Sequence, residues 1–239
     1  MRQQRSPRLP APRLPYNGGW HEDRNLRGSM ANLITTARFL LLYLLVWMAY
    51  RAPPAWQLLD APLVVVIFVL DGIDGYVARR RGESSLFGSV FDIAVDRVVE
   101  NVLWLVLGDL GLVPIWIAIL FVTRGFLVDS IRSRGAARGE TPFGMMRSPL
   151  GRFLVAGHFM RGTYGVVKAT AFAWLLMIQP WPMLFPALWA QWSGVLQGIG
   201  HGLAYLAVLF SLARGLPVMA EFALRNGRPR RTPGARGTR

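Results

Sequence analysis

The chain has 239 residues, of which 53% are hydrophobic and only 17% are charged, and its formal net charge is +14. So high an apolar fraction is typical of an integral membrane protein and argues against a soluble domain. Because the sequence contains no cysteine, it excludes disulfide bonds, a thiolate nucleophile and a cysteine-ligated zinc site.

From the N-terminus, residues 1–28 form a polar tail rich in proline and arginine, which we expect to be disordered and not a secretory signal. A bilayer-spanning helix needs roughly 17–25 apolar residues. Six windows of that kind follow, at about 33–50, 61–79, 87–108, 112–131, 153–178 and 194–213. Residues 217–239 form a second basic tail. We therefore predict an all-α membrane protein with a six-helix domain at 29–216 and a short interfacial segment before the first span.

The arginines predict the orientation of the six spans. They concentrate in the N-terminal segment, after the second span, between the fourth and fifth spans, and in the C-terminal tail. In the opposite connections, near 51–60, 109–111 and 179–193, the only basic residue is Arg51. Because basic residues stay on the cytoplasmic side, both termini are expected inside, in the bacterial inner membrane. The basic tails then serve topology and attraction to anionic lipid headgroups, and we expect no nucleic-acid partner.

Four aspartates stand at the cytoplasmic ends of the second and third spans. Asp71 and Asp74 are three residues apart, and Asp92 and Asp96 are four apart, so each pair occupies one face of its helix. The two spans are joined by the short loop RRRGESS and are expected to be antiparallel neighbours, which lets the acidic faces meet. Converging carboxylates repel one another unless a cation neutralises them, and an all-oxygen set suits Mg²⁺ or Mn²⁺, with Ca²⁺ as a further candidate.

Small residues lie beside these acids. Gly75, Ala78 and Gly88 leave room for a ligand or for close helix packing, and Arg79 is placed to meet phosphate oxygens. Metal sites of this kind commonly bind phosphates. A purely structural role, in which the acids pair with arginines, is the alternative. Because ionisable residues inside a membrane are functional by default, we favour a functional site.

The same residues resemble the motif of a known family. The pattern Asp71-x-x-Asp74-Gly75-x-x-Ala78-Arg79, eight residues, Gly88-x-x-x-Asp92-x-x-x-Asp96 matches the CDP-alcohol phosphatidyltransferase motif at every defining position. The stretch ANLITTAR near the first span is similar to a further segment of that family, with matches at Asn32, Thr35 and Arg38. The resemblance covers roughly residues 28–214 and leaves the two basic tails aside.

This resemblance implies an enzyme of phospholipid biosynthesis. Members of the family transfer a substituted phosphate from a CDP-linked donor, usually CDP-diacylglycerol, to an alcohol and release CMP. By similarity, Asp71, Asp74 and Asp92 hold divalent cations, either Mg²⁺ or Mn²⁺. Asp96 is a further metal ligand or, as we favour, the general base. The residues implied at the cytidine diphosphate site are Asp71, Gly75, Ala78, Arg79 and Gly88.

The acceptor site is expected among basic residues near the cytoplasmic ends of the fourth and fifth spans. Arg124 and Arg132 resemble the paired arginines of the family branch that uses glycerol phosphate, although Gly125 replaces the acidic residue of that pattern. A cluster of positive charge suits a phosphorylated acceptor such as glycerol 3-phosphate or inositol phosphate. The plainer role for these arginines is to mark a cytoplasmic helix end. The candidate acceptor residues are Arg124, Arg132, Arg161 and Lys168.

Further alternatives stay open at the level of sequence. A divalent-cation transporter, with aspartates lining its path, is the competing class of function, although such sites are expected near the bilayer midplane. Glu100 continues the face of Asp92 and Asp96 by one turn, and it either tunes the site or pairs with an arginine such as Arg97. A homodimer is implied by the family resemblance alone.

Overall fold

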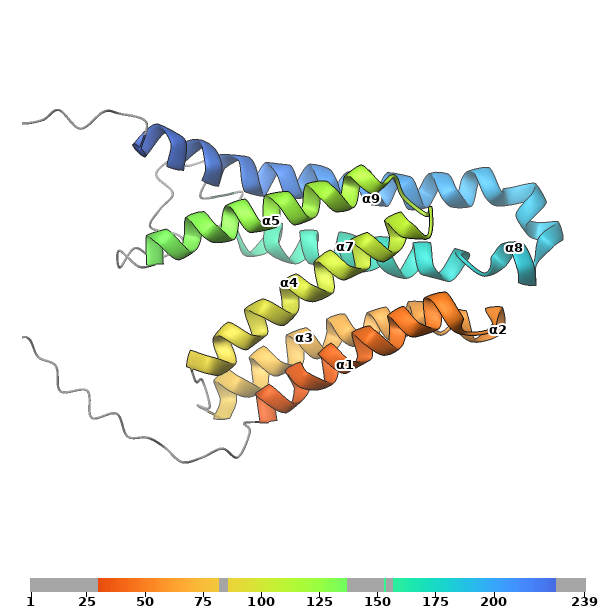
Figure 1. The fold of residues 1–239 in the computed structure, drawn as a ribbon, viewed down its shortest axis with the longest axis horizontal. Coiled ribbons are helices and arrows are strands. Elements are labelled where there is room, and N and C mark those ends of the chain that lie inside the picture. Colours follow the sequence, from red (N-terminus) through yellow and green to blue (C-terminus); the bar gives the residue numbers. More distant parts are fainter. Residues whose placement is uncertain (1–29, 82–85, 137–152, 154–156, 227–239) are drawn as a thin grey trace, which may run out of the picture.

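The computed structural model describes residues 30–81, 86–136, 153 and 157–226. This part of the chain consists of helices and short turns, without strands (Figure 1). Six long helices correspond to the six expected spans, and two four-residue helices lie in the connections between them. The helices are α1 Met30–Arg51, α2 Pro54–Gln57, α3 Asp60–Arg81, α4 Leu86–Asp109, α5 Ile115–Ala136, α7 His158–Ile178, α8 Trp181–Leu184 and α9 Pro186–Asn226.

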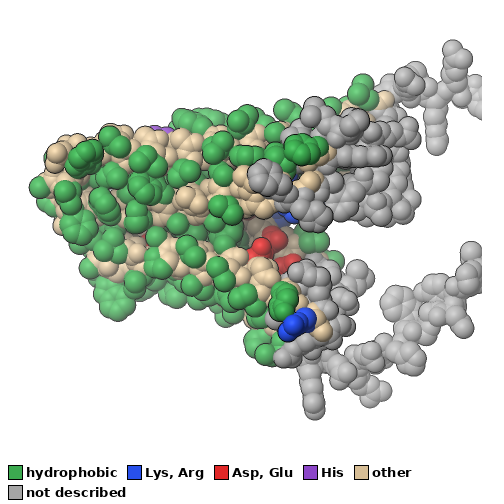
Figure 2. Space-filling view, turned by 180° about the vertical axis from the view of Figure 1, so that it is seen from behind, with side chains coloured by type: hydrophobic (Ala, Val, Ile, Leu, Met, Phe, Trp, Pro, Cys, Tyr) green, Lys and Arg blue, Asp and Glu red, His purple; other side chains and the backbone are tan. Residues whose placement is uncertain are grey.

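The long helices have the length of membrane-spanning segments, and three stretches are also apolar enough. Helices α1, α3 and α5 have 22 residues each, about 33 Å at 1.5 Å per residue, which is enough to cross a hydrocarbon core of about 30 Å. Large apolar side chains such as Trp47, Val69 and Leu209 are exposed, and hydrophobic atoms dominate the face seen in Figure 2. Three stretches combine sufficient length with sufficient apolarity: Asn32–Arg51, Pro54–Asp74 and Pro186–Leu224. These features support a helical membrane protein, whereas six crossings with both termini inside stay a prediction.

The helices form two groups with α4 between them. Helix α1 packs against α3 and α4, helix α5 against α4 and α9, and helix α7 against α3 and α9. In Figure 1, α1 and α3 form one side of the bundle, α5, α7 and α9 form the other, and α4 runs obliquely between them. A turn at 110–114 joins α4 to α5, and its Gly111 has a φ of 70°, which glycine adopts without steric strain. Helix α4 begins near the end of α3, so their acidic stretches face the same end of the bundle (Figure 1).

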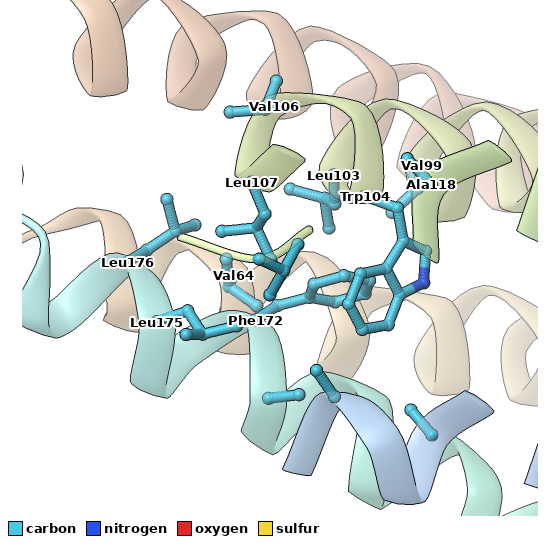
Figure 3. Packing of buried hydrophobic residues seen from close by; sticks show 14 of the residues in the cluster. Val64, Val99, Leu103, Trp104, Val106, Leu107, Ala118, Phe172, Leu175 and Leu176 are labelled. Carbon is cyan, nitrogen blue, oxygen red and sulfur yellow. The ribbon is translucent and has the colours of Figure 1, made fainter. Parts of the chain in front are cut away.

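An aromatic cluster holds the two groups together. The indole of Trp104 on α4 stacks on Phe121 of α5 with ring centroids 4.5 Å apart, and it meets the edge of Phe172 of α7 at 4.6 Å. The ring of Phe172 lies 6.0 Å from that of Phe68 on α3. Buried leucine and valine side chains surround these rings (Figure 3). One contiguous apolar core therefore joins α3, α4, α5 and α7 and sets the position of α4.

The last helix is longer than the sequence predicts. Helix α9 begins at Pro186, inside the connection expected on the outer side, and it ends at Asn226. Pro217 lies inside this helix, where it removes one backbone hydrogen bond that neighbouring contacts must offset. Val218 provides such a contact, because it is buried against Val128 of α5.

One predicted boundary is corrected by these observations. The basic tail expected from residue 217 was wrong for 217–226, because the sequence there is largely apolar and packs on α5. The fifth span was expected from about residue 153; α7 begins at His158, Gly157 N–H donates to the carbonyl of Phe153 at 3.1 Å, and residues 154–156 lie outside the described residues. The N-terminal tail, the interfacial segment and residues 227–239 lie outside the described residues.

Replacing Phe172 by alanine is expected to lower the free energy of unfolding by about 3–5 kcal/mol, because it leaves a cavity beside Trp104 and Phe68. Thermal or denaturant unfolding of the purified protein in detergent measures this loss. Phe126→Ala on α5 is the matched control, since that ring is 67% exposed and its removal should change stability by less than about 0.5 kcal/mol. Equal losses in the two variants would contradict the packing described.

Candidate active site

All four predicted aspartates meet at one place. Asp71 and Asp74 belong to the second half of α3, and Asp92 and Asp96 to the first half of α4. The prediction that the two acidic faces converge is confirmed, because all four side chains contact one common group. That group is the guanidinium of Arg38, which comes from a third helix, α1.

Arg38 forms an ion pair with every one of these carboxylates. Its Nη1 donates to Asp74 Oδ2 at 2.9 Å and to Asp92 Oδ1 at 3.1 Å. Its Nη2 lies 2.6 Å from Asp71 Oδ1 and 2.7 Å from Asp96 Oδ1. Each terminal nitrogen therefore bridges one acid of α3 and one acid of α4. Because the arginine side chain is only 2% exposed, water screens these contacts weakly.

The acids open toward a recess in the protein surface. Asp71, Asp92 and Asp96 are 41%, 37% and 46% exposed, whereas Asp74 is 3% exposed. Figure 2 shows acidic atoms inside a hollow between the two parts of the bundle. The hydroxyl of Thr35, one turn before Arg38 on α1, donates to Asp74 Oδ2 at 3.2 Å. The site therefore has a buried floor formed with α1 and a rim that a ligand can reach.

The arrangement fits a divalent cation. One carboxylate oxygen each from Asp71, Asp74 and Asp92 lies within 4.8 Å of the others, a spacing that an ion with oxygen ligands at about 2.0–2.6 Å can bridge. Asp74 Oδ1 is buried and has no hydrogen-bond partner among the described residues, and a buried acceptor of this kind needs a donor or an ion. Among the described side chains, Arg38 is the sole ion-pair partner of the four acids, which leaves a formal excess of three negative charges within this group. Asp96 lies outside the three-oxygen group.

A second network of charges lies directly beyond Asp96 along α4. Arg97 pairs with Glu100 at 2.9 Å and, through Nε, with Asp129 of α5 at 2.6 Å. Glu100 also accepts hydrogen bonds from Lys168 Nζ at 2.7 Å and from the Tyr164 hydroxyl at 2.9 Å, both on α7. The open alternatives for Glu100 thus resolve in favour of pairing with Arg97. Two acids balance two bases here, and the network ties α4, α5 and α7 together.

Three arginines near this network form no ion pair with any acid in the described part of the chain. Arg124 on α5 is 8% exposed, and its Nε is buried without a hydrogen-bond partner. Its side chain lies where a Cβ of Gly215 on α9 would be, with Nε 2.7 Å from that position. Arg214 lies over the ring of Tyr164, with Cζ 5.3 Å from the centroid. The third arginine, Arg132, is close enough for its charge to repel those of the other two. An excess of positive charge of this kind suits an anion such as phosphate.

The predicted acceptor residues separate into two groups. Arg124, Arg132 and Arg161 lie within electrostatic range of one another. Lys168 is instead engaged by Glu100 and lies over the ring of Tyr164, with Nζ 4.3 Å from the centroid. In the sequence its pairing partner could not be named, because Glu100 and Lys168 are far apart along the chain.

Sequence reasoning missed two residues of the site. It assigned Arg38 to a family segment without a role, and it did not single out Arg214. An arginine inside an apolar helix is the available signal for both, since such a charge needs a partner or a ligand. Of the residues expected at the nucleotide site, Gly88 is half-buried in the first turn of α4. The side chains at 75, 78 and 79 fall outside the described residues, although their backbone belongs to α3.

Comparison with known proteins assigns the chain to a family. The family model of the CDP-alcohol phosphatidyltransferases matches residues 28–213. This range includes the four aspartates and Arg38, which form the acidic site, and the arginines at 124, 132 and 161, but not Arg214. The chain belongs to this family. It is 30% identical over 87 residues to a CDP-diacylglycerol–glycerol-3-phosphate 3-phosphatidyltransferase of Bacillus subtilis, an alignment covering 36% of this chain and 45% of the relative. It is 32% identical over 95 residues to an archaetidylinositol phosphate synthase of Aeropyrum pernix, covering 38% and 48% respectively.

Longer alignments have lower identity. The CDP-diacylglycerol–glycerol-3-phosphate 3-phosphatidyltransferase of Salmonella choleraesuis is 25% identical over 171 residues, which is 70% of this chain and 83% of the relative. The Bacillus and Aeropyrum alignments span about half the length of those curated relatives. Membership of this family of transferases favours an enzyme over the divalent-cation transporter considered from the sequence.

Replacing Glu100 by glutamine is expected to destabilise the fold by about 3–5 kcal/mol, because Lys168 then becomes a buried cation without its carboxylate. The double substitution Glu100→Gln with Lys168→Gln should recover part of this loss, since Arg97 keeps Asp129 as a partner. A double-mutant cycle of thermal unfolding in detergent measures the coupling. Strictly additive effects of the two substitutions would show that the pair does not form.

Proposed function

We propose that the protein transfers a phosphatidyl group from a CDP-linked lipid to the hydroxyl group of a phosphorylated alcohol and releases CMP. CDP-diacylglycerol is our best candidate for the donor. The observation that supports this most directly is the convergence of four aspartates of α3 and α4 in a recess, three of them with oxygens within 4.8 Å of one another. Family membership gives the reaction class, and the recess offers a place for the diphosphate.

The divalent cation, Mg²⁺ or Mn²⁺, is held by Asp71, Asp74 and Asp92 in this proposal. When bound, it supplies positive charge that stabilises the diphosphate and the departing CMP. The carboxylates of α3 and α4 would orient the donor, because they determine the position of the cation that its diphosphate contacts. The small residues Gly75, Ala78 and Gly88, with Arg79, are proposed to line the cytidine diphosphate site.

Asp96 is proposed to act as the general base. It lies outside the three-oxygen group and is the most exposed of the four carboxylates, so an acceptor hydroxyl can approach it. Its Oδ1 is held by Arg38 Nη2 at 2.7 Å, which fixes the direction of the carboxylate. The acceptor oxygen attacks the phosphorus that carries the lipid, its proton passes to Asp96, and the bond from that phosphorus to CMP breaks.

The acceptor is proposed to bind through a phosphate held by arginines. Arg124, Arg132 and Arg161 remain from the sequence prediction, and Arg214 of α9 joins them. Lys168 contributes by fixing Glu100. Glycerol 3-phosphate is our best candidate, since relatives of Bacillus subtilis and Salmonella choleraesuis carry its name. Inositol phosphate is the alternative, which the name of the Aeropyrum relative favours.

Placement in the membrane follows from the arginine distribution. We propose a location in the bacterial inner membrane with the recess facing the cytoplasm, so that a lipid donor enters from the bilayer and a water-soluble acceptor arrives from the cytosol. A homodimer stays a prediction of the family resemblance.

Asp96→Asn should reduce acceptor-dependent CMP release from CDP-diacylglycerol by about 10²–10⁴-fold, because the amide cannot accept the hydroxyl proton. Binding of Mn²⁺ should persist in this variant and be lost in Asp74→Asn. The control is Asp109→Asn, since that carboxylate lies at the far end of α4 and pairs with Tyr50. Wild-type turnover in Asp96→Asn would contradict the assignment of Asp96 as the general base. Loss of Mn²⁺ binding in that variant would make Asp96 a ligand instead.

Gly215→Ala should raise the KM for glycerol 3-phosphate by about tenfold with little change in kcat, because the new methyl group displaces the buried Arg124 side chain. Gly202→Ala on the same helix is the matched control, since nothing lies within 4 Å of a Cβ there. Steady-state kinetics with glycerol 3-phosphate, inositol phosphate and unphosphorylated glycerol separate the acceptors. Equal KM values in the two variants would contradict a role for Arg124 in acceptor binding.

A further inference from the structure

Arg38 occupies the position at which the four carboxylates of the acidic site converge. Both of its terminal nitrogens are shared between an α3 acid and an α4 acid, at 2.6–3.1 Å. The side chain enters from α1 and is almost completely buried. A guanidinium thus already provides positive charge where a metal ion would provide it.

We propose that Arg38 is the resident counter-ion of the acidic site, and that a divalent cation must displace its guanidinium from Asp71, Asp74 and Asp92 in order to bind. The inference deepens the proposed function, because it concerns how that site takes up its cation. It assigns Arg38 the role of a positioning residue that tunes metal affinity.

The competition follows from which carboxylates are shared. The residues whose oxygens lie within 4.8 Å of one another, Asp71, Asp74 and Asp92, are three of the four acids that hold Arg38. A cation placed among them approaches the guanidinium closely, and like charges at such a distance repel strongly in a partly buried site. Removing the guanidinium should therefore strengthen binding of the metal.

A partner remains for Arg38 after displacement. Asp96 lies outside the three-oxygen group and pairs with Nη2 at 2.7 Å. The guanidinium can therefore give up three carboxylates and keep the fourth, which retains a buried charge in an ion pair.

The same residue should stabilise the protein without metal. Four carboxylates on two helices repel one another, and Arg38 links them to α1. Its loss should lower the stability of the metal-free protein and increase the stabilisation gained on adding metal, because binding is linked to folding. If Arg38 only preorganised the ligands, its loss would instead weaken metal binding.

The test uses the full-length protein in lipid nanodiscs, without any CDP-linked donor. Mn²⁺ binding is measured by electron paramagnetic resonance titration, and thermal unfolding is followed with and without Mn²⁺. Arg38→Gln should bind Mn²⁺ at least about tenfold more tightly than the wild type, with a lower Tm in the absence of metal and a larger rise on its addition. Arg97→Gln is the matched control, since Arg97 is ion-paired with Glu100 and Asp129, and its Kd for Mn²⁺ should stay within about threefold.

Arg38→Lys covers the case in which Arg38→Gln does not fold. An ammonium keeps the charge but cannot bridge four carboxylates in a planar fork, so this variant should bind Mn²⁺ more tightly than the wild type and less tightly than Arg38→Gln. Unchanged or weaker Mn²⁺ binding in the folded Arg38 variants would overturn the inference, as would the absence of Mn²⁺ binding by both wild type and variants. Because no donor is present, this outcome is independent of whether CMP is released.

Discussion

Four carboxylates drawn from two helices cannot be brought into a partly buried recess without positive charge, and Arg38 of α1 provides it. Each of its terminal nitrogens bridges α3 and α4, so the ion pairs join three helices at one point. The aromatic core formed around Trp104 holds α4 in the position that makes these contacts possible. Burying charges in this way stabilises little by itself, because desolvation offsets much of the attraction. The arrangement is therefore better explained by the chemistry of the recess than by stability.

The buried and half-buried charges described here fall into three groups. The acidic site carries a negative excess, which suits a divalent cation and the diphosphate that such a cation binds. The network of Arg97, Glu100, Asp129 and Lys168 is balanced and joins α4, α5 and α7. Arg124, Arg132 and Arg214 carry a positive excess, which suits the phosphate of an acceptor. The balanced network ties together α4, α5 and α7, and each of the two charge excesses suits its own ligand.

The long helices and the two pairs of aspartates could be predicted from the sequence, because the length of an apolar stretch and helical spacing are local properties. Spacing placed Asp71 with Asp74 and Asp92 with Asp96, and the structure bears out their convergence. It could not say that Arg38 reaches all four, because the packing of α1 against α3 and α4 depends on tertiary contacts. The pairing of Lys168 with Glu100 and the approach of Arg124 to Gly215 depend on the same kind of contact. The C-terminal boundary failed because basic residues follow an apolar stretch that packs on α5.

We propose that Asp71, Asp74 and Asp92 form one divalent-cation site in the recess beside Arg38. Anomalous scattering from crystals grown with Mn²⁺ tests this claim most directly. We expect an anomalous peak among these three carboxylates, with the Arg38 guanidinium moved toward Asp96. A peak located elsewhere, or no peak while all four carboxylates still hold Arg38 at a saturating Mn²⁺ concentration, would contradict it.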